Sequence, residues 1–242
     1  MAKLSCVPRE HATSKCSRTR QSCAADAERY FFTEVRVTMR RLDGIHRRTV
    51  QVYERNAQAW DEHRTRIFFE QNWLDKFIEL LPSEGRVLDV GCGAGEPIAQ
   101  YFLKRGLELT GLDASPKMLE ISKSRFPKST WIEMDMREMK LDTKFDGIAS
   151  WNGFFHLNQE EQRKTLLLFA DHLNSNGSLL LTIGHESGEV TGTVEGEEVY
   201  HSSLAPDEYK AILNAVGFES VEIELQDENC GSHSILLATR SK

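Results

Sequence analysis

The sequence predicts an α/β protein built on a doubly wound, seven-stranded mixed sheet with helices on both faces and an antiparallel last strand. Three observations lead to this fold class. Short apolar segments that suit strands alternate with helical windows over most of the chain. A glycine-rich turn directly follows the first of these strands. Only the polar loop QDENCGSH separates the last two strands, so the final strand should run antiparallel to its neighbour.

Composition narrows the choice of partners. The 242 residues are 40% hydrophobic, which suits one sizeable core, and the apolar runs of about five residues are far shorter than the roughly 20 that cross a bilayer. The net charge of −7 conceals a basic segment 1–48, with 11 Lys/Arg against 5 Asp/Glu, and an acidic remainder with 19 against 32. Since an acidic body disfavours nucleic acid, we expect a small-molecule partner, with no nucleic acid and no membrane.

The cysteines indicate the compartment. Five irregularly spaced cysteines fit neither a disulfide framework nor a paired zinc motif. We therefore predict a reducing, cytoplasmic location and no metal site.

The chain should divide into three parts. Residues 1–47 are predicted to be a disordered basic tail. The beginning of this tail has three interpretations, which stay open: a solvated tail, an Arg- and Ser-rich targeting presequence, or translation from an upstream start, with Met39 as the true start. Residues 48–82 form a predicted helical lid, and residues 83–242 form the ligand-binding domain.

The elements follow in order along the chain. Apolar residues at three- and four-residue steps predict two amphipathic helices between residues 48 and 81, and Pro82 ends them. The predicted strands are Arg86–Val90, Glu108–Leu112, Thr130–Glu133, Phe145–Ser150, Leu179–Ile183, Val221–Leu225 and Ser234–Thr239. The predicted helices between them are Ile98–Lys104, Pro116–Ser124, Gln159–Leu173 and Pro206–Val216. In such sheets ligands bind beyond the carboxyl ends of the strands, where the strand order reverses.

The stretch VLDVGCGAGEP, residues 87–97, contains the strongest motif. Gly91, Gly93 and Gly95 follow a strand that holds Asp89 near its end. A dinucleotide fingerprint would have a third glycine at the position of Glu96, and two carboxylates here would repel a pyrophosphate. A ligand with an ammonium, a carboxylate and a sulfonium suits this turn better, because the acid accepts from the ammonium and backbone N–H groups meet the carboxylate.

With its apolar strand, acid and G-x-G-x-G, the chain resembles the class I S-adenosylmethionine-dependent methyltransferases of the small-molecule, bacterial type, which have a Rossmann-like fold. The resemblance covers roughly residue 52 to the end. It implies S-adenosylmethionine as the cofactor, above Gly91–Gly95, and a small-molecule methyl acceptor with an oxygen, nitrogen or carboxylate nucleophile. It also implies that Tyr53 and Trp60 line a lid, although their spacing equally suits one buried helix face.

The ends of the next strands complete the predicted cofactor site. Asp113, followed by Ala114, lies 18 residues after Gly95, where an acid binds the two ribose hydroxyls. The resemblance places Asp135 and Met136 at the adenine ring. Trp151 falls at the rim of the site, after the fourth strand.

The predicted acceptor site is built around WNGFFH. The resemblance places Asn152 where related small-molecule enzymes have an acid, and the absence of a Pro-Pro pair argues against nucleic-acid or protein amide acceptors. His156, Asn152 and His201 are the candidate catalytic residues. His185, Tyr200, His201 and His233 are expected to surround the acceptor.

Two alternatives remain open. A non-catalytic protein that binds S-adenosylmethionine or a partner would explain why Asn152 replaces an acid. An NAD-dependent oxidoreductase would use the same turn and Asp113, but Glu96 and Asp135 argue against it. The oligomeric state is left open.

Overall fold

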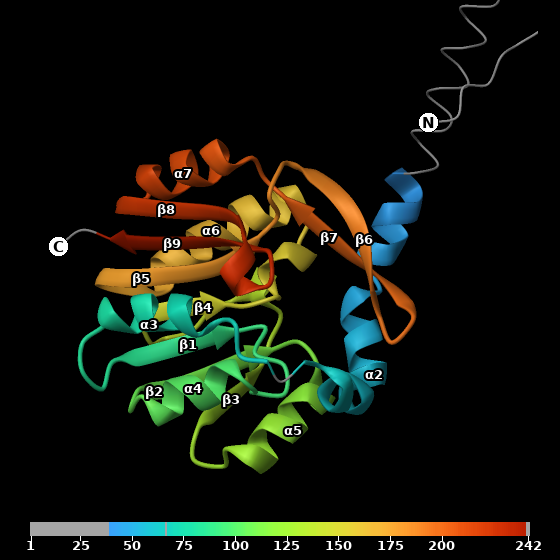
Figure 1. The fold of residues 1–242 in the computed structure, drawn as a ribbon, viewed down its shortest axis with the longest axis horizontal. Coiled ribbons are helices and arrows are strands. Elements are labelled where there is room, and N and C mark those ends of the chain that lie inside the picture. The colour runs from blue at the N-terminus through green and yellow to red at the C-terminus, as the bar shows by residue number, and fades with distance from the viewer. Residues whose placement is uncertain (1–38, 66, 241–242) are drawn as a thin grey trace, which may run out of the picture. The chain divides into compact units, whose positions relative to one another are not determined.

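A computed structural model describes residues 39–65 and 67–240 of the chain. Seven strands form one sheet in the order β3-β2-β1-β4-β5-β9-β8 (Figure 1). Their bounds are β1 Arg86–Val90, β2 Glu108–Asp113, β3 Thr130–Glu133, β4 Phe145–Ser150, β5 Leu173–Ile183, β8 Phe218–Asp227 and β9 His233–Arg240. Strands β1 to β5 are parallel, and β9 is antiparallel to both β5 and β8. The predicted fold class is therefore confirmed.

Helices cover both faces of this sheet. Their bounds are α2 Thr49–His63, α3 Gln71–Glu79, α4 Ile98–Lys104, α5 Pro116–Arg125, α6 Gln159–His172 and α7 Pro206–Ala215. Because successive strand residues point to opposite faces, Val87 packs with α3 and α4 whereas Leu88 packs with α6 and α7. None of the helices within the described ranges is long and apolar enough to cross a membrane.

The predicted start of the folded body was placed too late. The unit that carries the sheet begins at Leu42, and residues 42–46 are already helical, with Ile45 buried. Ile45 begins the apolar spacing that Val52 continues, but neighbouring Gly44 and the basic pair at 47–48 obscure it in the sequence. The predictions about residues 1–38 lie outside the described residues.

The long Gly- and Glu-rich connection after β5 forms its own hairpin. Strands β6 Gly188–Val194 and β7 Glu197–Ser203 pair antiparallel in a separate two-stranded sheet. The turn between them uses Glu195 and Gly196, both with positive φ, as a tight two-residue hairpin turn requires. Figure 1 shows this hairpin beside α2, at the edge of the main sheet where the site lies.

Candidate active site

A cavity opens at the carboxyl ends of β1, β2 and β4, and it encloses about 1110 Å³ including the part open to solvent. The glycine turn, the loops after β2, β3 and β4, and one face of the N-terminal helical segment line it. That face consists of His46, Thr49, Val50, Tyr53, Trp60 and Arg64. The three- and four-residue spacing of these positions is the helical repeat, so one side of α2 lies along the cavity.

Helix α2 is fastened on two sides. Its Glu54 accepts a hydrogen bond of 2.6 Å from Ser115 at the start of α5, and its Asp61 binds the Arg125 guanidinium through both oxygens. On the other side, Arg55 donates to Glu197 of the hairpin at 2.6 Å. These contacts hold the helix over the cavity.

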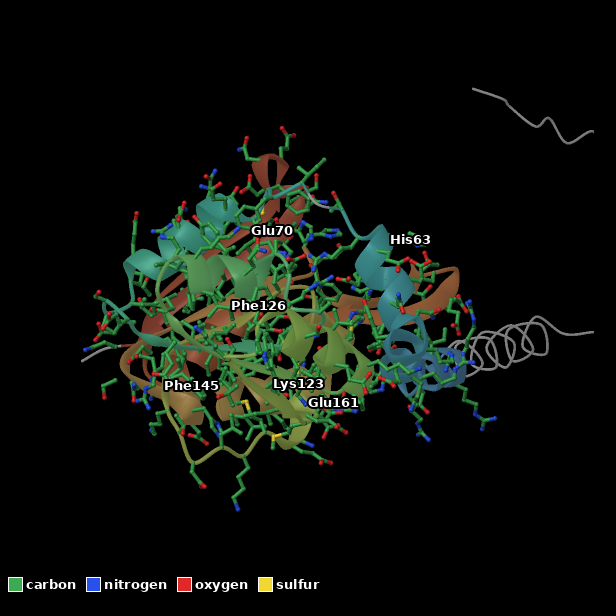
Figure 2. The ribbon with its side chains drawn as sticks, turned by 90° about the horizontal axis from the view of Figure 1, so that it is seen from below. His63, Glu70, Lys123, Phe126, Phe145 and Glu161 are labelled. Carbon is green, nitrogen blue, oxygen red and sulfur yellow. The ribbon has the colours of Figure 1, made fainter. Side chains whose placement is uncertain are left out.

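The glycine turn is shaped by close backbone approach. Gly91 and Gly93 have φ values of 70° and 52°, which other residues rarely adopt, and both line the cavity. A Cβ on Gly91 would lie 3.3 Å from the Cα of Gly153. Gly95, predicted to bind cofactor, is not among the lining residues, because it faces Phe126 and Ser122 of the α5 end instead (Figure 2 labels Phe126).

Two buried acids lie at the ends of β1 and β2. Asp89 is 2% exposed and its Oδ2 has no hydrogen-bond partner among the described residues. Burial, aided by the nearby Asp113 charge, raises the pKa of Asp89 to about 7. Asp113 accepts from the N–H groups of Gly93 and Ser115, each at 2.8 Å. Burial also raises the pKa of Asp113, although these backbone N–H groups oppose that shift.

Asp135 and Met136, which follow β3, and Ala114, which follows β2, also line the cavity. The Asp135 carboxylate accepts from the backbone N–H and the guanidinium of Arg137. Burial alone would raise the pKa of Asp135, but the bonds from Arg137 lower it overall. Asp135 is therefore a carboxylate held in place by a neighbour of its own loop.

Arg64 was missed by sequence reasoning. It follows the last residue of α2 and lines the cavity, and one of its N–H groups donates to the Glu96 carbonyl. Its charge lowers the pKa of Asp89 and of Tyr53. The only sequence signal was its position on the same helix face as Tyr53 and Trp60.

His156 is the one predicted histidine that lines the cavity, and both of its ring nitrogens are engaged. Its Nδ1 lies 2.8 Å from the Tyr200 carbonyl and must donate there, so its Nε2 accepts from the Tyr53 hydroxyl at 2.9 Å. Burial, with His201 nearby, lowers the pKa of His156 to about 3. The ring is therefore neutral, and its two nitrogens are occupied by Tyr53 and Tyr200.

The four residues expected to surround the acceptor do not line this cavity. His185, Tyr200, His201 and His233 are not among the lining residues. His201, a candidate catalytic residue, packs over Gly192 within the hairpin and edge-on to Phe155, with its ring centre 5.0 Å from that of His156. The register of β6 and β7 decides this, because it directs His201 onto the neighbouring strand.

Trp151 and Asn152 line the cavity with polar atoms that lack partners within the described chain. The Trp151 side chain is 6% exposed, and neither its Nε1 nor the Asn152 Oδ1 has a hydrogen-bond partner. Asn152 is held by its backbone, with φ of 56° and its N–H donating to Thr182 Oγ1 at 2.7 Å. Buried polar atoms of this kind usually await a ligand or a water. No group of three His, Cys, Asp or Glu side chains in residues 39–65 and 67–240 is arranged to hold a metal.

The sequence of the chain is similar to those of known methyltransferases. A family model described as "Methyltransferase domain" matches residues 87–177. The putative methyltransferase YqeM of Bacillus subtilis is 37% identical over 103 residues, 40% of each chain. A Streptomyces venezuelae protein, dTDP-3-amino-3,4,6-trideoxy-alpha-D-glucopyranose N,N-dimethyltransferase, is 31% identical over 102 residues, which are 41% of this chain and 43% of that protein. This chain thus spans about two-fifths of the length of these two relatives.

A solved structure shares the fold. The SAM-bound amino pentose methyltransferase CalS10 of Micromonospora echinaspora superposes with a TM-score of 0.60 at 20% identity, over 74% of this chain and 93% of that one.

Proposed function

Because the chain carries a methyltransferase domain on the class I, S-adenosylmethionine-dependent fold, we propose that it transfers a methyl group from S-adenosylmethionine to an amine nitrogen of a small molecule. The family resemblance seen in the sequence is confirmed. The observation that carries the proposal is the buried Oδ2 of Asp89, which has no partner among the described residues and lies in a cavity that Arg64 also lines. An ammonium and a carboxylate on one carbon need such a pair of charges.

The lining residues fit the cofactor along its whole length. Asp89 would bind the ammonium and Arg64 the carboxylate, with the glycine turn admitting the ligand close to the backbone. Asp113, already fixed by two N–H groups, has lone pairs left for the ribose hydroxyls. Asp135 and Met136 would border the adenine ring.

The bound cofactor supplies a methyl group on a positive sulfur, which is an excellent leaving group. The protein then contributes mainly by orienting the acceptor and excluding water. Helix α2, held by Asp61 and Glu54, covers the cavity and would exclude water from it. Trp151 and Asn152 also line the cavity, and they would offer the methyl acceptor one N–H donor and one carbonyl acceptor.

The side chains around the acceptor favour nitrogen. His156 has no unoccupied nitrogen to take a proton, and Asn152 cannot ionise. A hydroxyl nucleophile needs a base to remove its proton, whereas an uncharged amine attacks directly. An amine N–H also suits the Asn152 Oδ1, which can accept it. The S. venezuelae relative is itself named for N-methylation of an amino sugar, which supports the choice.

We expect binding of the demethylated cofactor, S-adenosylhomocysteine, to strengthen as the pH rises from about 5.5 to 7. The pKa of Asp89 is about 7, so below that value the carboxyl must lose a proton before it can accept from the ligand ammonium. The dissociation constant should fall by up to about tenfold per pH unit in that window. Isothermal titration at three pH values measures this. Asp89→Asn should bind weakly with no such slope, and a flat wild-type profile would contradict the role of Asp89.

We expect Tyr53→Phe to reduce methyl transfer while leaving S-adenosylhomocysteine affinity within about twofold. Tyr53 lines the cavity and its hydroxyl is oriented by His156. We propose that the remaining lone pairs of this hydroxyl help to position the acceptor, so its loss should remove about 1 kcal/mol or more, roughly five- to tenfold in kcat/KM. The measurement is product release with an amine identified in the screen below. Tyr101→Phe is the matched control, because that hydroxyl binds Asp75 away from the cavity. Equal rates of product release for the two variants would show that the Tyr53 hydroxyl does not contribute to methyl transfer.

The proposed function is tested by titrating the full chain with S-adenosylmethionine and S-adenosylhomocysteine, followed by a screen of amines and their hydroxyl counterparts for S-adenosylhomocysteine release. Micromolar binding and turnover on amines alone is the expected result. Tight binding without turnover on any acceptor would favour a non-catalytic binding protein. Binding of NADH in place of S-adenosylmethionine would instead support an NAD-dependent oxidoreductase.

A further inference from the structure

A chain of hydrogen-bonded polar side chains connects the cavity to the first turn of α6. Asp135 and Arg137 follow β3 and line the cavity. The Arg137 Nη1 donates to Glu161 Oε1 at 2.9 Å, and Glu161 Oε2 lies 2.7 Å from Nε2 of His46, which also lines the cavity. Glu161, labelled in Figure 2, is not among the lining residues, and the proposed function gives it no role.

Glu161 is held in place by its own helix. It forms a capping box with Asn158, in which the Asn158 side chain accepts from the Glu161 N–H and the Glu161 carboxylate accepts from the Asn158 N–H, each at 2.9 Å. Burial alone would raise the pKa of Glu161, but the bonds from His46 and Arg137 lower it to about 2. Glu161 is therefore an ionised carboxylate at a fixed position.

Arg137 is bonded to a carboxylate on each side. Its Nε and Nη2 donate to the two oxygens of Asp135, and its Nη1 donates to Glu161, 24 residues further along the chain. A long, partly exposed side chain is fixed only weakly by a single ion pair. The second carboxylate holds the guanidinium in one orientation, and the orientation of the Asp135 carboxylate follows from it.

The bonds from Arg137 leave Asp135 one position at which it can accept a further hydrogen bond. A carboxylate has about four lone-pair sites on its two oxygens. The Asp135 Oδ1 accepts from the backbone N–H and the Nε of Arg137, and Oδ2 accepts from Nη2 alone. The remaining site on Oδ2 suits one N–H donor of a ligand, and the exocyclic amino group of adenine is such a donor.

We infer that Glu161 is a positioning residue for Asp135, that it acts through Arg137, and that it thereby sets the preference of the protein for the adenine amino group. This inference rests on the proposed function, in which Asp135 borders the adenine ring. Without the Glu161 charge, the Arg137 Nη1 loses its partner. The guanidinium can then turn to cover the remaining Oδ2 site or move into solvent, and either movement weakens recognition of the amino group.

The test compares S-adenosylhomocysteine with S-inosylhomocysteine, in whose purine ring an oxygen replaces the amino group. The wild-type chain should prefer S-adenosylhomocysteine by about tenfold or more, because a carboxylate accepts from an N–H but not from a carbonyl oxygen. In the full chain, Glu161→Gln should weaken S-adenosylhomocysteine binding by roughly five- to tenfold and leave S-inosylhomocysteine binding within about twofold. Isothermal titration measures both. Glutamine also serves in a capping box, so the start of α6 is preserved.

Glu160→Gln is the matched control. Glu160 is the neighbouring acid in the same turn of α6, but its side chain is 74% exposed and bonded to Lys164, whereas that of Glu161 is 21% exposed. Its substitution should change the affinity for neither ligand.

A double-mutant cycle makes the test specific to Arg137. Arg137→Met should lose the preference for S-adenosylhomocysteine, and adding Glu161→Gln to it should cause no further loss, because Glu161 acts through the arginine. Arg137→Lys keeps the positive charge but lacks the planar fork, so it should lose most of the preference as well.

Four results would overturn the inference. They are additive losses in the cycle, an unchanged preference in Glu161→Gln or in Arg137→Lys, no preference in the wild-type chain, and an equal loss for both ligands with a lower melting temperature, which indicates a structural role. Failure of the wild-type chain to bind either ligand would instead overturn the proposed function itself.

Discussion

Replacing Asp113 with alanine should weaken S-adenosylmethionine binding by on the order of 100-fold, about 3 kcal/mol. The carboxylate serves two purposes in one place. It is the proposed partner of the two ribose hydroxyls, and it accepts the Gly93 and Ser115 N–H groups that shape the glycine turn and the start of α5. The variant loses the ligand bonds and leaves both backbone donors without their partner. Isothermal titration with S-adenosylmethionine and S-adenosylhomocysteine measures the loss.

Asp146→Ala is the matched control for this variant. Asp146 is also a carboxylate in the sheet, and it accepts from the Arg86 N–H at 2.8 Å and from Asn174 at 2.7 Å, near the start of β1 and away from the cavity. Its loss should lower the melting temperature without changing cofactor affinity. If Asp113→Ala bound the cofactor as well as Asp146→Ala does, the ribose site would be misplaced.

Gly147→Ala should destabilise the fold by about 3 kcal/mol, which lowers the melting temperature by roughly 6 to 12 °C. Gly147 lies within β4, and a Cβ there would meet the Phe77 ring at 2.5 Å and the Leu81 side chain at 3.0 Å. Phe77 is fully buried between α3 and the sheet, so it has no space into which to withdraw. The added methyl would push α3 away from the sheet. Thermal unfolding followed by circular dichroism measures the change.

Gly188→Ala is the control that distinguishes steric crowding by the added methyl group from the mere replacement of a glycine. Gly188 is an exposed strand residue in β6, and a Cβ there has no atom within 4 Å. The melting temperature of the Gly188→Ala variant should stay within about 2 °C of wild type, since surface substitutions rarely change the free energy of unfolding by more than about 0.5 kcal/mol. Similar losses in the two variants would mean that α3 does not pack on β4 as described.

The sheet could be predicted closely from local pattern. The bounds of β1, β3 and β4 agree residue for residue with the strands expected from the sequence, because the strands are short segments between clear turn signals. The predicted β5 strand was too short, since its first residues, Leu173 to Gly177, include Asn and Ser and resemble a loop.

The strand-end residues of the candidate site could be predicted for a similar reason. Asp89, Asp113, Asp135 and Trp151 all lie at or just after the carboxyl ends of parallel strands, and such ends meet along one edge of a sheet. The structure brings all four to one cavity. Their roles toward the cofactor remain predictions that the titrations above decide.

The sequence by itself determined the order of the elements, the direction of the last strand and the acids that border the cavity, because each depends on residues close together in the chain. Only the tertiary structure decided that both His156 ring nitrogens are bonded to Tyr53 and Tyr200, that His201 packs inside the hairpin, and that Arg64 lines the cavity. Most of these contacts join segments that are distant in sequence. These contacts form because α2 and the hairpin pack against the sheet, and the local periodicity of the sequence does not predict that packing.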